Sequence, residues 1–409
     1  MNTDFRFAPL RLLILLLALG IPTFAQEVED TIRIKTRVVF LDALVKDKKT
    51  NQPVNNLTTD NFEVLDDGKP RNISYFTREG QARKPLALVV ILDIREDGAG
   101  RFLKRPEIIK AMEEELAKLP PGDEVAIMTM NLGEDEERYW LTEFTNDRTK
   151  LAAALARVQA ICEGKEKLPD EARQQTVTVT EKKPAEVLET ETIKGRNGAV
   201  VTRETLSDGS VNVKRVNKDG NVTIEIDDIY DMAAAVRDAT RKTETLRPNS
   251  QASIVWISDG IAPIFFEDRD ATQQILIRKN VIFNSLTVEL RTLFKFLMPI
   301  GKPIAGWAGV SIYGSAKQLA QQSGGEAVKV GRPKDYSAGL ARIIGNLTAR
   351  YSLGFTLAEN ETDDGRLHNL EVRLKATDQK GKKRKLEVSS RQGYYMSSAT
   401  SAETAKREQ

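Results

Sequence analysis

Uninterrupted apolar runs alternate with one-sided apolar stripes over residues 85–350. The run Leu86–Leu92 ends at Asp93, and a second run ends immediately before Asp259. Continuous runs rich in β-branched residues are typical of parallel strands that are buried on both faces. In the segment 108–119 the apolar residues instead recur on one face of a helix. This alternation predicts an α/β domain with a doubly wound sheet.

The same pattern locates the other elements of this domain. The sequence predicts further strands at residues 125–130, 138–142, 253–258, 281–286 and 326–330. It predicts helices from the Asn146-Asp147 cap to residue 162, and at residues 229–246, 315–322 and 334–350.

Residues 31–80 and 351–395 show the two-residue alternation of antiparallel strands instead. The first segment contains the Asp66–Lys69 turn, whose Asp-Asp-Gly-Lys sequence indicates a hairpin. Neither segment holds enough strands for a complete sandwich. We therefore predict that the two segments pair into one discontinuous antiparallel β-sandwich, into which the α/β domain is inserted.

Residues 163–225 interrupt the α/β pattern and contain few large apolar side chains. Asn-Gly or Asp-Gly pairs begin at Asn197, Asp208 and Asp219, eleven residues apart each time, with Val/Thr-rich stretches between them. Such pairs favour hairpin turns, so we predict a β-rich insertion. The alternative is a polar segment without regular structure.

The two ends of the chain carry separate signals. Residues 1–25 combine basic residues, an apolar core at 12–19 and a small residue at Ala25, as signal peptides do. The alternative for this segment is an uncleaved membrane anchor. No later apolar run approaches the roughly 20 residues of a spanning helix, so we expect an exported protein with no transmembrane segment after cleavage, located in the periplasm, in the outer envelope or secreted. The polar tail 396–409 is predicted to be disordered.

Composition excludes several functional classes. The 61 basic and 59 acidic residues give a net charge of +2, which argues against nucleic-acid binding. His368 and Cys162 are the only residues of their types, so a cysteine-rich zinc site is excluded. No nucleophile can be tied to His368, which we interpret as a structural or surface residue, and Cys162 as buried and inert. Any metal is expected to be a hard cation bound by oxygens.

Acidic side chains follow two of the predicted strands. Ligands of open α/β sheets bind at the carboxyl ends of the strands, where Asp93, Asp97 and Asp259 are expected to lie. Together they can share Mg²⁺ or Ca²⁺. A simpler interpretation also holds at this point: such an aspartate often caps the following helix, and Asp259-Gly260 can be only a turn.

The sequence resembles a known family. The stretches LVVILD (88–93) and VWISDG (255–260), with the strand–helix order, resemble a von Willebrand factor type A domain. Exported bacterial proteins of the VWFA-related type, common in acidobacteria, have segments similar to residues 54–70, 319–325, 351–355 and 391–395. The resemblance covers residues 31–395 apart from the insertion. It implies a Rossmann-like fold and a non-enzymatic role in protein binding or cell adhesion.

The resemblance also implies a metal-ion-dependent adhesion site, from which this sequence departs. The family pattern has Asp-x-Ser-x-Ser after the first strand, a later Thr, and an Asp after the fourth strand. Asp93 and Asp259 match it, whereas Arg95, Asp97 and Asp227 replace the two serines and the threonine. Our leading hypothesis is a degenerate site, in which the Arg95 guanidinium replaces the cation and pairs with Asp93 or Asp259. The alternative is a carboxylate-rich Mg²⁺ or Ca²⁺ site with Arg95 turned outward.

An apolar segment at residues 293–310 is broken by prolines and glycines and cannot form one helix. Its aromatic residues Phe294, Phe296 and Trp307 either pack against the sandwich or bind a partner protein.

Two further functions remain open. One is a hydrolase that uses the carboxylates with a metal, and the other is a structural envelope component with a vestigial site.

Overall fold

The computed structural model describes most of the chain from Arg37 onward. The described residues are 37–78, 84–96, 99–131, 137–169, 187–194, 200–206, 211–216, 222–227, 232–260, 264–288, 310–311, 314–358, 360–377 and 381–396. The predicted signal peptide and residues 397–409 of the predicted tail lie outside them, whereas Met396, predicted as the first residue of that tail, is buried. No helix in this described part is long and apolar enough to cross a membrane.

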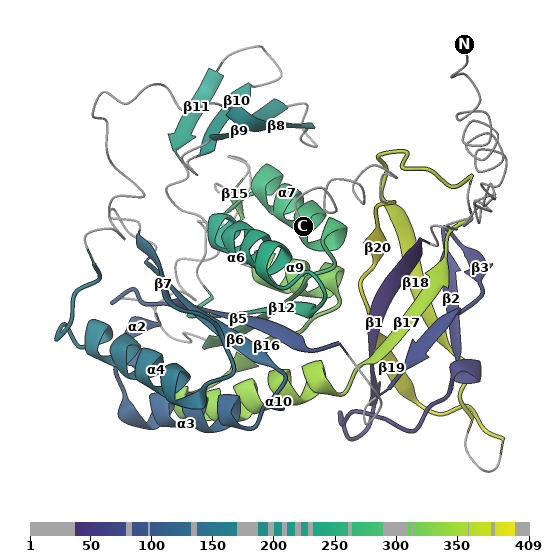
Figure 1. The fold of residues 1–409 in the computed structure, drawn as a ribbon, viewed down its shortest axis with the longest axis horizontal. Helices are drawn as coiled ribbons and strands as arrows, with labels where there is room; N and C mark the ends of the chain where they lie inside the picture. Colours follow the sequence, from purple (N-terminus) through teal and green to yellow (C-terminus); the bar gives the residue numbers. More distant parts are fainter. Residues whose placement is uncertain are drawn as a thin grey trace, which may run out of the picture. The chain divides into compact units, whose positions relative to one another are not determined.

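A six-stranded sheet forms the centre of the α/β part (Figure 1). Its strands are, in spatial order, β16 (Ala327–Val330), β14 (Ile282–Val288), β12 (Gln251–Ser258), β5 (Leu86–Asp93), β6 (Glu124–Asn131) and β7 (Glu137–Thr145). The first five strands pair in parallel, and β7 pairs antiparallel with β6. This mostly parallel sheet with flanking helices confirms the predicted α/β fold class.

Helices cover both faces of the sheet (Figure 1). One face packs against α2 (Gly100–Leu103), α3 (Pro106–Ala117), α4 (Arg148–Cys162) and α10 (Tyr336–Thr348). The other packs against α6 (Met232–Leu246), α7 (Phe266–Arg278) and α9 (Ser315–Ser323). The apolar run of strand β5 is continuous because both of its faces are buried. Leu88 and Val90 lie in the first core, whereas Val89 and Ile91 lie in the second.

Helix ends follow the local sequence. The Asp147 side chain accepts hydrogen bonds from the backbone of Thr149 and Lys150 and caps α4, as predicted. Helix α9 ends at Ser323 and is capped by Gly324, whose φ of +82° lies in the left-handed region that favours glycine. The sequence analysis did not predict α7 or the short α2. Helix α7 has the sequence FEDRDATQQILIR. Its large aliphatic residues occur only near the end, so they form no apolar stripe from which a helix could be predicted.

Strands from both ends of the chain form two antiparallel sheets. One has the order β19 (Leu386–Ser389), β1 (Val38–Asp47), β17 (Tyr351–Thr356) and β4 (Tyr75–Thr77). The other has the order β20 (Gly393–Tyr394), β18 (His368–Leu374), β2 (Phe62–Asp66) and β3 (Lys69–Arg71). Residues of both sheets, such as Leu41, Leu353, Val64 and Val372, share one buried core. Pairing between strands of the first and last segments is what the predicted discontinuous sandwich requires. The predicted boundaries of these two segments, 31–80 and 351–395, stay predictions.

Within the predicted insertion, four strands pair antiparallel in chain order. They are β8 (Val187–Lys194), β9 (Val200–Leu206), β10 (Val211–Val216) and β11 (Val222–Asp227). The three predicted turns lie outside the described residues, and the boundaries 163–225 stay a prediction. A two-stranded ribbon pairs β13 (Ile264–Phe265) with β15 (Val310–Ser311), and two short 3₁₀ turns, η1 (Thr59–Asn61) and η2 (Pro333–Asp335), complete the described elements.

Candidate functional site

The candidate site lies at the carboxyl edge of the central sheet. Strands β5 and β12 are parallel neighbours, and their register pairs Leu92 with Ile257. The next residues along the two strands therefore bring Asp93 close to Ser258 and Asp259. The Asp93 side chain is fully buried and that of Asp259 is 1% exposed. Two buried carboxylates at one sheet edge require a compensating positive charge.

Arg95 supplies this positive charge. Its Nε lies 3.2 Å from Asp93 Oδ1 and its Nη2 lies 2.9 Å from Asp93 Oδ2, which forms a two-pronged guanidinium–carboxylate pair. The same Nη2 donates to Asp259 Oδ1 at 3.0 Å. The Arg95 side chain is 12% exposed, so this contact is largely shielded from water. One guanidinium group thus bridges the two aspartates.

Ser258 is a member of the site that the sequence analysis did not name. Its Oγ donates to Asp93 Oδ2 at 2.7 Å and lies 3.3 Å from Asp259 Oδ1. The backbone N–H of Gly260 in turn donates to this hydroxyl at 3.3 Å. Ser258 stands directly before Asp259 in the sequence, but the strand pattern gives no indication that its hydroxyl faces Asp93.

Backbone hydrogen bonds hold Ile94 against the sheet and connect Gly100 to Arg95. The N–H of Ile94 donates to the Met130 carbonyl at 2.8 Å, and the N–H of Gly100 donates to the Arg95 carbonyl at 2.9 Å. A Cβ atom at Gly100 would lie 2.3 Å from the Ile94 carbonyl oxygen and 2.5 Å from that of Arg95. The backbone therefore fixes Arg95 close to the aspartates, and only glycine fits at position 100.

The buried carboxylates influence two neighbouring groups. Burial, with added repulsion from Asp259 and Asp93, raises the pKa of the Tyr336 hydroxyl, which has no hydrogen-bond partner in the described part of the chain. Burial raises the pKa of the Cys162 thiol to about 12, and the charge of Asp93 contributes. Both groups therefore stay protonated at neutral pH. Cys162 is the last residue of α4 and packs against the core.

These residues do not fit a divalent cation while Arg95 occupies this position. Both oxygens of Asp93 and one of Asp259 already accept hydrogen bonds from the guanidinium group. A Mg²⁺ or Ca²⁺ ion needs such oxygens as direct ligands. The fixed charge of Arg95 would also repel an ion at the same place. The pair of aspartates would accept a cation only if the arginine left.

The structure does not describe the other predicted site residues as fully. Asp97 lies outside the described residues. Asp227 is the last residue of β11, but its side chain is not described. The aromatic residues of the apolar segment, Phe294, Phe296 and Trp307, also lie outside the described part of the chain. Their roles stay predictions.

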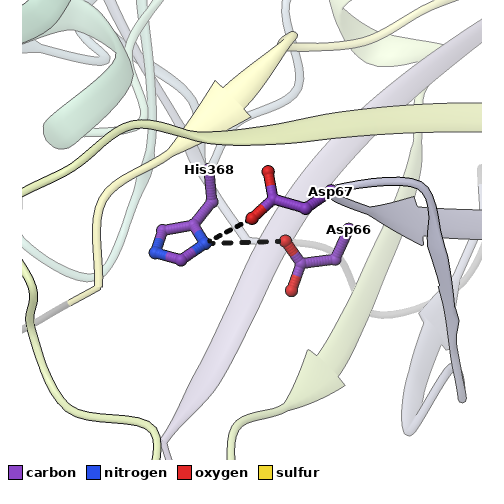
Figure 2. A group of neighbouring side chains, drawn as sticks. All are labelled: Asp66, Asp67 and His368. Atoms are coloured by element: carbon purple, nitrogen blue, oxygen red, sulfur yellow. Dashed lines mark hydrogen bonds and ion pairs between the residues drawn. The ribbon is translucent and has the colours of Figure 1, made fainter.

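A second group of ionisable side chains lies in the β part and was not predicted as a site. Asp66 and Asp67, at the turn after β2, face His368 at the start of β18 (Figure 2). The Asp-Asp-Gly turn and the single histidine were each noted in the sequence. Their proximity depends on the pairing of β2 with β18, whose residues are about 300 positions apart.

Among known proteins, matches to this chain were found only among solved structures. No protein-family model matches the chain, and no curated protein matches it. The conserved hypothetical protein BatB from Bacteroides thetaiotaomicron is 10% identical over 63% of this chain and 98% of its own, with a TM-score of 0.32. A von Willebrand factor type A structure from Catenulispora acidiphila is 8% identical over 84% of this chain and 70% of its own, with a TM-score of 0.34.

The pilus adhesin SpaC from Lactobacillus rhamnosus GG is 8% identical over 83% of this chain and 49% of its own, with a TM-score of 0.33. The type A resemblance predicted from the sequence is thus also found among solved structures, while the acidobacterial subtype stays a prediction. At these identities and TM-scores the likeness carries no argument about the site or its chemistry. The strand order and contacts described above carry that argument.

Proposed function

We propose that the chain is an exported, non-enzymatic protein of the von Willebrand factor type A kind, which binds another protein and has a degenerate metal-ion-dependent adhesion site. The observation that supports the degenerate site is the bridge of Arg95 to Asp93 and Asp259. The guanidinium group takes the place where the family pattern expects the cation.

The substitution changes how a partner is held. A bound metal with an open coordination position takes up a carboxylate of the partner as a direct ligand. A guanidinium group forms no such bond and offers only hydrogen bonds and charge. Arg95 already directs three side-chain hydrogen bonds at the two aspartates. Partner binding then depends on the loops around Asp93 and Asp259 together with neighbouring surfaces, among which we include the 163–225 insertion and the segment with Phe294, Phe296 and Trp307.

The chemistry of the described groups supports a role without catalysis. The thiol of Cys162 has a pKa of about 12, so it carries almost no nucleophilic thiolate at neutral pH. His368 is bonded to carboxylates in the β part and contacts no described serine or cysteine side chain through its ring nitrogens. Turnover that depends on Asp93 and Asp259 would overturn this part of the proposal.

Calorimetric titration of Mg²⁺ and Ca²⁺ into the metal-stripped chain tests the degenerate site. We expect no binding by the wild type and binding of one ion by Arg95→Ser, which frees the carboxylates. The double variant Arg95→Ser/Asp259→Ala should lose this binding again. Wild-type binding that Asp259→Ala abolishes would instead establish a metal-dependent adhesin with an unusually acidic site.

A second experiment tests the partner role. Chemical crosslinking of the exported protein in its own cell envelope identifies the proteins that it contacts. We expect these crosslinks to weaken when Asp93, Asp97 and Asp259 are replaced together by alanine in a variant whose folding is checked by circular dichroism. Unchanged crosslinks would favour a structural envelope component with a vestigial site.

A further inference from the structure

The second ionisable cluster joins the two ends of the chain. Asp66 ends strand β2 and Asp67 begins the turn to β3, whereas His368 begins β18. Strands β2 and β18 pair antiparallel, with Asp66 opposite Leu370. Figure 2 shows one ring nitrogen of His368 facing the carboxylates of both aspartates. The His368 side chain is 3% exposed and that of Asp66 is 4% exposed.

Asp364 orients the His368 ring through Nε2, the ring nitrogen that faces away from Asp66 and Asp67. Its Nε2 lies 3.2 Å from Asp364 Oδ1, and its Nδ1 lies 3.0 Å from Asp67 Oδ2 and 3.9 Å from Asp66 Oδ1. When Nε2 carries the proton and donates to Asp364, Nδ1 presents a lone pair. A carboxylate behind the second ring nitrogen is the usual arrangement of metal-binding histidines. Three electron-pair donors, His368 Nδ1, Asp66 Oδ1 and Asp67 Oδ2, then face one another.

Asp66 is the residue that points most directly to a ligand. Its Oδ2 accepts from Arg71 Nε at 2.9 Å, from Arg71 Nη2 at 2.7 Å and from the Tyr394 hydroxyl at 3.0 Å. Its Oδ1 is buried and has no hydrogen-bond partner among the described residues. A buried acceptor without a partner costs free energy, and this oxygen is the one that faces His368 Nδ1.

Asp67 is held in a similar way. Its Oδ1 accepts from the backbone N–H of Asn369 at 3.0 Å, which leaves Oδ2 toward the histidine. Arg366 Nη2 also lies 3.0 Å from this Oδ2, but its side chain is 59% exposed. The φ of Asp67 is +48° and that of Gly68 is +79°, so the turn itself sets the direction of the carboxylate.

We propose that Asp66 Oδ1, Asp67 Oδ2 and His368 Nδ1 bind one divalent transition-metal ion of the Zn²⁺ class. The three atoms lie within 4.8 Å of one another. One imidazole nitrogen and two carboxylate oxygens form a donor set that zinc accepts, with a fourth position left for water. Mg²⁺ and Ca²⁺ prefer oxygen ligands alone, so the nitrogen selects against them.

The charges around the cluster agree with a divalent ion. Arg71, Arg366 and His368 contact four carboxylates, which belong to Asp66, Asp67, Glu361 and Asp364, and the charge of Arg37 also acts on Glu361. With a neutral imidazole, four negative charges face three positive ones, so the cluster keeps an excess of negative charge that favours a bound cation. The bound ion would link strands of the N-terminal and C-terminal segments, whose ligands Asp67 and His368 are 301 positions apart. Such a clip stabilises the fold because the unfolded chain lacks the assembled site.

The test is a zinc titration of the metal-stripped full chain, followed by calorimetry and by the thermal unfolding midpoint. We expect one Zn²⁺ per wild-type chain, a higher midpoint with zinc, and no comparable effect of Mg²⁺ or Ca²⁺. His368→Gln and Asp67→Asn should each weaken zinc binding by at least about tenfold, because each removes a direct ligand. Asp363→Asn is the matched control, since its carboxylate lies in the same loop and accepts from the backbone of Gly365 instead.

Absence of zinc binding by the wild type would overturn the proposal, and so would unchanged affinity in both ligand variants. Circular dichroism shows whether His368→Gln folds. If it does not, Asp67→Asn decides, because asparagine adopts the left-handed conformation of this turn readily. Arg95→Ser should bind zinc like the wild type, so failure of the degenerate-site proposal and failure of this one are distinguishable.

Discussion

Removing the Arg95 guanidinium group should destabilise the fold strongly. Arg95→Met keeps most of the side-chain stem but removes the guanidinium charge from beside Asp93 and Asp259, whose side chains are 0% and 1% exposed. Three side-chain hydrogen bonds to carboxylates are lost, each contributing about 1.5–3 kcal/mol. Because these contributions overlap, we use the cost of breaking a buried ion pair, about 3–5 kcal/mol. That is a large part of the 5–15 kcal/mol of a typical domain.

Urea unfolding followed by circular dichroism measures this loss. Arg332→Met is the matched control, because Arg332 also pairs with an aspartate, Asp335, but its side chain is 67% exposed. An exposed pair contributes at most about 1 kcal/mol. Adding Asp259→Asn to Arg95→Met should recover part of the loss, since one buried charge is then removed.

The reasoning fails if Arg95→Met costs no more than Arg332→Met. It also fails if Asp259→Asn in the Arg95→Met background lowers stability further, because the buried charges would then not be the cause. Mg²⁺ should raise the unfolding midpoint of Arg95→Met but not that of the wild type, through binding to the freed carboxylates.

Three further outcomes follow from the described contacts. Gly100→Ala should lower the free energy of unfolding by about 1–3 kcal/mol, because a Cβ there meets backbone only 2.3 Å away; an unchanged urea midpoint would contradict this. Cys162, with a pKa of about 12, should resist thiol alkylation at pH 8 in the folded chain and react after unfolding. Burial raises the pKa of Glu326, but the hydrogen bond and charge of Lys46, the hydrogen bond of Asn346 and the charge of Arg342 together outweigh it and hold the pKa below 4.5. At neutral pH the wild type should therefore have a higher free energy of unfolding than Glu326→Gln, and this difference should shrink as the pH falls below 4.5. Urea unfolding at several pH values measures the difference.

The α/β part was largely predictable because its signals are local. The continuous run that forms β5 and the capping Asp147 of α4 each needs only neighbouring residues to be recognised. The same strand-end rule placed Asp93 and Asp259 at one sheet edge. The sequence predicted that Arg95 pairs with one of these aspartates, and in the structure it reaches both.

The features that were missed depend on long-range geometry or on absent periodicity. Helix α7 lacks an apolar stripe, so the pattern of apolar residues does not predict a helix there. The hydroxyl of Ser258 faces Asp93 because of strand register and side-chain rotation, which one sequence does not encode locally. The cluster around His368 forms only when β2 pairs with β18, about 300 residues further along the chain. Composition alone led us to expect oxygen ligands for any metal, because a single histidine offers no imidazole pair.

The two carboxylate clusters meet the same electrostatic requirement by different means. At the edge of the central sheet, the chain supplies its own cation, and the oxygens that face the centre accept hydrogen bonds from Arg95. Around His368, two arginines approach from outside, yet Asp66 Oδ1 has no donor among the described residues. Under the two proposals made above, a permanent guanidinium charge makes the first cluster independent of metal supply, and the second is complete only with an added cation. The metal dependence that the type A pattern places at the sheet edge would then lie in the β part instead.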